Sequence, residues 1–150
     1  MTVIEEIREV FSTFHDGTIL AWTGNKNLLT LTIDCQYLAR KIDKSFDTFY
    51  VVLSNIDKIE LVPWTTPIDI PAVTITEIPD IFKGDLEILS ADMEDDESVV
   101  IICAQHDTNF NYSGGHLTIS CQTIKVYDQN KNEITIDQLE KICFDYWNKK

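Results

Sequence analysis

The chain of 150 residues has the length of one ordinary domain, and a composition of 44% hydrophobic and 25% charged residues is typical of a globular protein. Twenty-five acidic residues against twelve Lys and Arg give a net charge of −13, which repels phosphate backbones and anionic membrane surfaces. We therefore expect neither nucleic acid nor a membrane as partner. Five glycines and four prolines provide no flexible linker, so residues 1–150 predict a single domain.

The acidity has two interpretations. It keeps a protein in solution, or it speeds the encounter with a basic partner protein. The first six residues carry two acids and no basic stretch, which is not typical of a secretory signal, and no apolar run approaches the ~20 residues of a membrane helix. We therefore expect a cytoplasmic protein. Its cysteines form no CxxC pair and should be free thiols in or near the core: Cys35, Cys103, Cys121 and Cys143.

The amino-terminal residues predict an amphipathic helix that ends before Gly17. Thr2 can cap its start, with Glu5 three residues on as the partner of a capping box. Its apolar residues recur at helical spacing: Ile4, Ile7, Val10, Phe11 and Phe14. Residues 18–22 and 28–35 then predict two strands, joined by a hairpin connection at residues 24–27.

The middle of the chain predicts a second hairpin, formed by residues 49–53 and 59–62 around a turn at residues 54–57. All four prolines fall within residues 63–79, which should therefore be loop or edge strand. One short helical turn is expected at residues 76–82.

The second half predicts a third hairpin, of residues 86–91 and 98–106, and a last long strand at residues 116–127. Residues 99–104 are apolar on both faces, so we expect a central strand that is covered on both sides. The last strand changes face at Ile124, which indicates a bulge or a change of covering.

A second amphipathic helix is predicted at the carboxyl end, where Thr135 and Gln138 form a capping box. Both terminal helices should pack on the doubly apolar central strand. Hairpins with a helix at either end predict an α+β fold of mainly antiparallel sheet, sandwich-like or roll-like.

The three histidines suggest a possible metal site. His15-Asp16 and His106-Asp107 repeat one dipeptide of the kind that metal phosphohydrolases use. If the last hairpin pairs His106 with His116, the two imidazoles stand together and Asp107 can supply a third zinc ligand. The alternative is that these are histidines in contact with solvent.

The loop at residues 107–115 is the most suggestive segment for binding. Phe110 and Tyr112 interleave with Asn109 and Asn111, and aromatic anchors beside adaptable amides are typical of recognition loops. The two rings can equally fold back onto the sheet as a lid. Trp64, between two prolines, is either a further exposed anchor or a plug over the edge of the sheet.

Motifs for nucleotide binding, hydrolysis or metalloprotease chemistry are absent: the sequence has no Walker loop, GxSxG, HExxH or GxGxxG. The sequence therefore predicts no catalytic residue and no cofactor, and it favours a protein that is not an enzyme.

Two stretches resemble known proteins. The segment Phe14-His15-Asp16-Gly17-Thr18-Ile19, leading into an alternating strand pair, resembles the opening of several small, uncharacterised bacterial families of β-rich proteins. The segment from Gly115-His116-Leu117-Thr118-Ile119 to Tyr146-Trp147 is similar to their carboxyl ends. Some of these families are similar to immunity proteins of polymorphic-toxin systems. The resemblance implies a β-rich domain that binds a partner protein and has no catalytic residues to carry over.

Three functional hypotheses follow. The first is a non-enzymatic domain that binds a basic protein, such as a toxin, through its acidic surface and loop aromatics. The second is a metal-dependent or small-ligand enzyme that uses His15, His106, Asp107 and His116. The third is a structural or homo-oligomeric domain in which Trp64 and a sheet edge form the interface.

Overall fold

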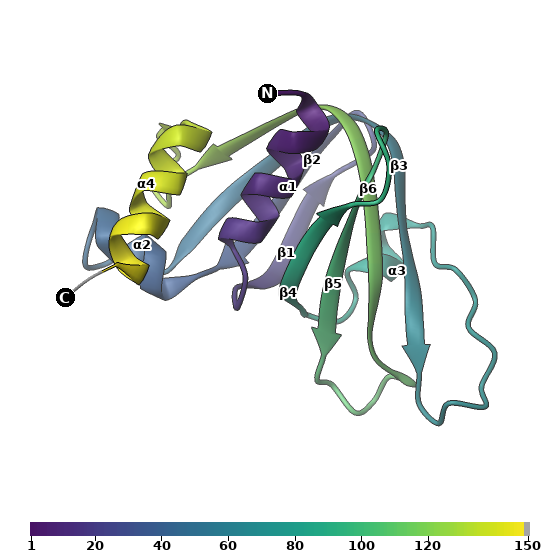
Figure 1. Cartoon of the computed structure of the whole chain (residues 1–150). Coiled ribbons are helices and arrows are strands. Elements are labelled where there is room, and N and C mark those ends of the chain that lie inside the picture. The colour runs from purple at the N-terminus through teal and green to yellow at the C-terminus, as the bar shows by residue number, and fades with distance from the viewer. Residues whose placement is uncertain (149–150) are drawn as a thin grey trace.

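A seven-stranded antiparallel sheet and four helices make up the described residues, 1–148, of the computed structural model (Figure 1). The strands are β1 (Thr18–Gly24), β2 (Leu28–Asp34), β3 (Thr48–Thr65), β4 (Leu86–Met93), β5 (Val99–Gln105), β6 (Tyr112–Tyr127) and β7 (Glu133–Ile134). The helices are α1 (Val3–Thr13), α2 (Gln36–Ile42), α3 (Ile78–Ile81) and α4 (Ile136–Trp147). This confirms the predicted α+β class of mainly antiparallel sheet.

The sheet closes on itself through its two longest strands. Neighbouring strands follow the order β3-β2-β1-β4-β5-β6-β7, and β3 also pairs with β6 along most of its length. The junction between β1 and β4 is short, because these strands pair only at Thr18↔Glu87 and Ile19↔Leu86. One face of each strand in the ring therefore lines a shared interior, and the other face points outward.

The predicted second hairpin, of residues 49–53 and 59–62, is wrong, because both segments belong to the single strand β3. The turn-like residues between them bend the strand instead. Asn55 has a positive φ of 51°, and the β3–β6 register shifts between Ile56 and Lys58. β6 pairs with β3 on both sides of the bend, so the chain continues rather than reversing.

α1 forms where the apolar spacing predicted it. The Thr2 hydroxyl oxygen accepts a hydrogen bond from the Glu5 N–H at 3.2 Å, which caps the helix. Figure 1 shows α1 lying across the front of the curved sheet, where it packs against β4 and β6. The Ser12 hydroxyl donates to the Ala91 carbonyl at 3.2 Å and so ties the last turn to β4. The apolar stripe is buried in the core: Ile4, Ile7, Val10, Phe11 and Phe14.

α4 begins with the predicted capping box: the Gln138 N–H donates to Thr135 Oγ1, and the Thr135 N–H donates to Gln138 Oε1. Its packing differs from the expectation, because its main contacts are with α1 and α2 and not with the central strand. α2, which the sequence analysis did not predict, provides Tyr37, whose ring centroid lies 4.7 Å from that of Tyr146 on α4. Among the helices of the described residues, none is long and apolar enough to cross a membrane.

β5 lies in the middle of the sheet, between β4 and β6, but only one of its faces is covered. Three of its side chains are completely buried: Val99, Ile101 and Cys103. The alternating side chains of Val100, Ile102 and Ala104 are half-buried and do not pack against the core. The expected second cover is therefore wrong, because α4 packs on helices and leaves this face open.

β6 begins at Tyr112, four residues before the predicted start of the last strand. Gly114 lies inside it with a φ of +155°, and a Cβ atom there would stand 2.2 Å from the Cys103 carbonyl oxygen of β5. Only glycine allows this approach. The predicted change of face at Ile124 is confirmed, and it occurs opposite the bend of β3.

Candidate protein-binding face

The loop between β5 and β6 turns its two aromatic side chains inward. Tyr112 is 4% exposed, and its ring stacks on Phe110 with 5.9 Å between the centroids. Phe110 is half-buried against the core, with the Lys83 ammonium 5.2 Å from its ring centroid. Burial raises the pKa of the Tyr112 hydroxyl, which therefore stays protonated. Of the two interpretations of this loop, these contacts favour the lid.

Gln105, a buried polar residue at the end of β5, holds the loop in place. Its Nε2 donates to the carbonyl oxygens of Asp107, at 3.0 Å, and Tyr112, at 2.7 Å. The Asp107 carboxylate in turn accepts a hydrogen bond from the Asn109 N–H at 2.9 Å. Asn109 and Asn111 are exposed at the loop tip. The loop is thus braced by hydrogen bonds, and its two amides face solvent while its two aromatic rings do not.

The three proposed metal ligands, His106, His116 and Asp107, are not brought together. The assumed pairing of His106 with His116 is wrong: because β6 starts earlier than predicted, His116 lies opposite Ile102. His106 Nε2 lies 2.8 Å from the Glu87 carboxylate, and Asp107 is engaged within its loop. In the part of the chain that the structure describes, no group of three or more His, Cys, Asp or Glu residues is placed to hold a metal ion.

His15, the third histidine, belongs to the helical end of the molecule. Its Nδ1 donates to the Ser12 carbonyl at 2.8 Å, and its ring stacks on Trp147 of α4 with 5.4 Å between centroids. The Tyr37 hydroxyl donates to the His15 carbonyl at 2.7 Å. These contacts give His15 a packing role between α1, α2 and α4.

The outward face of β5, β6 and β3 carries an apolar surface, which we call the outer patch. The outer patch consists of Val62, Trp64, Val100, Ile102, Ala104 and His116. Ile102, His116 and Val62 lie side by side across the three strands, because Ile102 pairs with His116 and His116 pairs with Val62. Their chain neighbours Ile101, Leu117 and Leu61 are completely buried on the opposite face. The alternation of a strand therefore places this row outside the core.

Trp64 and His116 form the most prominent contact of the outer patch. Their rings meet edge-on with 5.6 Å between the centroids, and Trp64 is half-buried while His116 is exposed. Trp64 lies outside the set of side chains that pack against the core. The sequence prediction named Trp64 as an anchor but did not connect it with His116 or β5.

Carboxylates border the outer patch on both sides. On β4, Asp92 pairs with Val100 and Glu87 pairs with Ala104, while Glu60 precedes Val62 on β3 by two residues. Antiparallel partners share a face, so these acids surround the apolar centre. Two of these carboxylates have a partner: Glu60 is paired with Lys58 at 3.4 Å, and Glu87 lies 2.8 Å from His106 Nε2.

The turn between β4 and β5 adds further negative charge at the Asp92 end of the outer patch. Its residues 94–97 are all acids. The Asp95 carboxylate accepts hydrogen bonds from the N–H groups of Glu97, at 2.7 Å, and Ser98, at 2.9 Å. These bonds, led by the one from Glu97, lower the pKa of Asp95, so this carboxylate is ionised at neutral pH.

The composition of this face differs from that of an ordinary exposed sheet face. An exposed antiparallel sheet face normally alternates to polar residues, whereas β5 presents Val, Ile and Ala outward. An apolar centre with a charged border is the usual anatomy of a protein-binding surface. The signal was present in the sequence as the doubly apolar run at residues 99–104, but it was interpreted as a strand covered within its own chain.

Comparisons with models of known protein families, with curated proteins and with solved structures find no match to this chain.

Proposed function

We propose that the chain is a non-enzymatic protein-binding domain whose outer patch binds a basic partner protein. The single observation that carries this proposal is the outward row in which the half-buried Ile102 and Val62 flank the exposed His116, bordered by carboxylates. No helix or strand of the described residues packs over this row, so a partner would remove its side chains from water.

The negative charge of the chain favours a basic partner. Glu60, Glu87 and Asp92 flank the apolar centre, and the whole chain carries −13. A partner with Lys and Arg around an apolar protrusion complements this surface and is drawn to it at long range. A second copy of the chain would bring −13 against −13, which disfavours self-association through this face.

The resemblance to immunity proteins gives the partner a class to test first. Such proteins bind the toxin of their own system, and many toxin nucleases are basic. The acidic border of the outer patch suits a partner of that kind. In this proposal the aromatic loop of Phe110 and Tyr112 acts as a lid that supports the sheet end, and Trp64 is the anchor.

A site-specific photo-crosslinker tests the proposal. A photoreactive side chain at Ile102 should crosslink the chain to one basic protein in its own cells, and the adduct mass identifies that protein. A photoreactive side chain at Thr32, another half-buried strand residue, is the matched control and should give no adduct. An adduct between two copies of this chain, or equal adducts from both positions, would contradict the proposal.

Affinity for the identified partner then measures the role of the outer patch. Ile102→Lys should weaken binding at least about tenfold, because it removes an apolar contact and adds a like charge, whereas Thr32→Lys should change it less than about twofold. Isothermal titration calorimetry at low and high salt should show the affinity falling as salt rises. Equal effects of the two substitutions would place the interface elsewhere.

A further inference from the structure

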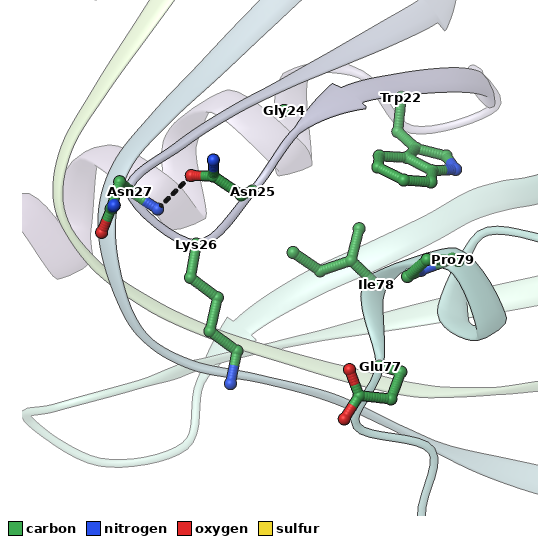
Figure 2. Close-up of a pocket in the computed structure, with 8 residues that line it drawn as sticks. All are labelled: Trp22, Gly24, Asn25, Lys26, Asn27, Glu77, Ile78 and Pro79. Atoms are coloured by element: carbon green, nitrogen blue, oxygen red, sulfur yellow. Dashed lines mark hydrogen bonds between the residues drawn. The ribbon is translucent and has the colours of Figure 1, made fainter.

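A groove lies at the hairpin between β1 and β2, separate from the outer patch. Its volume is about 410 Å³, and its walls come from the hairpin, at Trp22 and residues 24–27, and from the start of α3, at residues 77–79. Figure 2 shows the Trp22 ring facing Ile78 and Pro79 across this space. Trp22 is half-buried against the core while Ile78 is 6% exposed, so the groove opens directly onto the apolar interior.

The edge of β1 that borders the groove is unpaired. Beyond Ile19, β1 pairs with β2 alone, because the chain before Leu86 of β4 forms α3 and a short connection. In an antiparallel pair, successive residues direct their main-chain groups alternately toward and away from the neighbour. The Asn25 N–H bonds to the Leu28 carbonyl, so Thr23 faces β2 and Trp22 directs its N–H and C=O toward the groove side.

Trp22 and Gly24, which face away from β2 at this edge, therefore present main-chain donors and acceptors that no other described segment uses. Such an edge pairs readily with an extended chain. A strand added there would send alternate side chains toward the interior. The inward side chain of the added strand that lies next to Trp22 would reach the space between Trp22 and Ile78.

Two opposite charges stand at the mouth of the groove. Lys26 and Glu77 are both exposed, and no ion pair joins them. The amide side chain of Asn25 is fixed beside them, because its Oδ1 accepts hydrogen bonds from the N–H groups of Asn27, at 2.8 Å, and Leu28, at 3.3 Å. A ligand complementary to this mouth carries an acidic group opposite Lys26 and a basic group opposite Glu77.

We propose that this groove binds an extended peptide segment of a partner protein. The segment adds a strand to the free edge of β1, inserts one apolar side chain between Trp22 and Ile78 and places a basic side chain opposite Glu77. Main-chain pairing supplies affinity, and the groove and its charges select the side chains. This site is independent of the outer patch, and either can fail without the other.

A displayed library of random linear heptapeptides is the probe. Selection on the whole chain should enrich peptides with an apolar residue and a nearby Lys or Arg. A synthetic peptide from this set should slow hydrogen exchange of the amides of residues 20–24 in NMR spectra. Protection confined to other residues, or no peptide that binds more tightly than about 100 μM, overturns the proposal.

Two tryptophans on different faces provide the matched variants. Trp22→Ala should weaken the selected peptide at least about tenfold, while Trp64→Ala, on the outer patch, should change it less than about twofold. Equal losses from both overturn the proposal. Thermal melting checks that both variants fold. If Trp22→Ala does not fold, the exchange pattern of the unaltered protein decides.

A charge exchange tests the orientation of the peptide. Glu77→Lys should weaken the selected peptide, and a peptide in which the basic residue is replaced by Glu should regain affinity for this variant. Asp96→Lys makes the same change of charge on the β4–β5 turn, which does not line the groove, and should leave both peptides unaffected. If Asp96→Lys and Glu77→Lys lose the same affinity for the peptide, only the net charge of the chain matters. That result overturns the proposed contact.

Discussion

The two faces of β5 have nearly the same composition and opposite environments. Val99, Ile101 and Cys103 are completely buried, whereas Val100, Ile102 and Ala104 remain half-exposed on the outside of the closed sheet. Hydrophobicity therefore does not distinguish the core of this protein from its candidate binding surface. The distinction comes from what the rest of the described chain places over each face: α1 and the opposite strands lie on one side, and no helix of residues 1–148 lies on the other.

A run of apolar residues in a strand therefore indicates two apolar faces. It does not indicate whether each face is covered by the same chain or by a partner. An apolar outer face on a chain with a charge of −13 is the composition expected of a surface that a partner covers. Substitutions whose expected effects differ between the two faces test this interpretation.

The largest expected difference is in stability. Ile101→Ala should lower the free energy of unfolding by about 3 kcal/mol, because it leaves a cavity in the packed interior. Ile102→Ala, one residue away, should cost less than about 1 kcal/mol, because its side chain already contacts water. Urea denaturation with linear extrapolation measures both. Equal costs would mean that the outer face is also sealed within the folded chain.

An effect that is smaller for each pH unit should come from the buried thiol of the inner face at alkaline pH. Burial raises the pKa of the Cys103 thiol from 9.0 to about 12. Between these values the unfolded chain loses a proton that the folded chain keeps, so the free energy of unfolding falls as pH rises. The slope is ~1.4 kcal/mol per pH unit for one such thiol, and the contribution is complete below the unfolded pKa.

Cys103→Ala should make the alkaline decline shallower by this amount, whatever its effect at neutral pH. Urea denaturation at a series of pH values from neutral to alkaline measures the slope. Cys143→Ala is the control, because that thiol is only partly buried and its removal should change the slope less. An unchanged slope in Cys103→Ala would show that the thiol titrates normally in the folded state.

The smallest effect concerns the acidic turn beside the outer patch. The hydrogen bond from the Glu97 N–H lowers the pKa of Asp95 below 3.8, so its contribution to stability is present above the unfolded pKa and is lost as pH falls through the lower, folded value. Carbon-detected NMR titration should place the Asp95 midpoint below 3.8. A midpoint at or above that value would mean that the turn is not held in this geometry in solution.

Local sequence signals predicted the terminal helices well. The Thr2 cap and the Thr135–Gln138 capping box act within one helical turn, and the apolar spacing around Ile7 and Val10 describes a single stripe. α2 was missed because seven residues give too short a periodic pattern to distinguish a helix from a loop.

The candidate site was predicted only in part. Trp64 was named, but His116 was assigned to a metal hypothesis and Ile102 to the core. The reason is register: the partner of His116 depends on where β6 begins, and the strand starts at Tyr112 instead of after the glycines. For Phe110 and Tyr112 the sequence left two interpretations open, anchors of a recognition loop or a lid. Their inward direction accompanies the Gln105 hydrogen bonds, which no local pattern indicates.

By itself, the sequence determined the α+β class, the strand alternation, the helix caps and the negative charge, because each of these depends on residues that are close in the chain. Only the tertiary structure decided that β3 bends and pairs with β6, that the ring closes with a short β1–β4 junction, and that α4 packs on α2 and not on β5. These outcomes rest on pairings between distant segments, whose register no local pattern specifies. They are also what leaves the outer patch and the edge of β1 open.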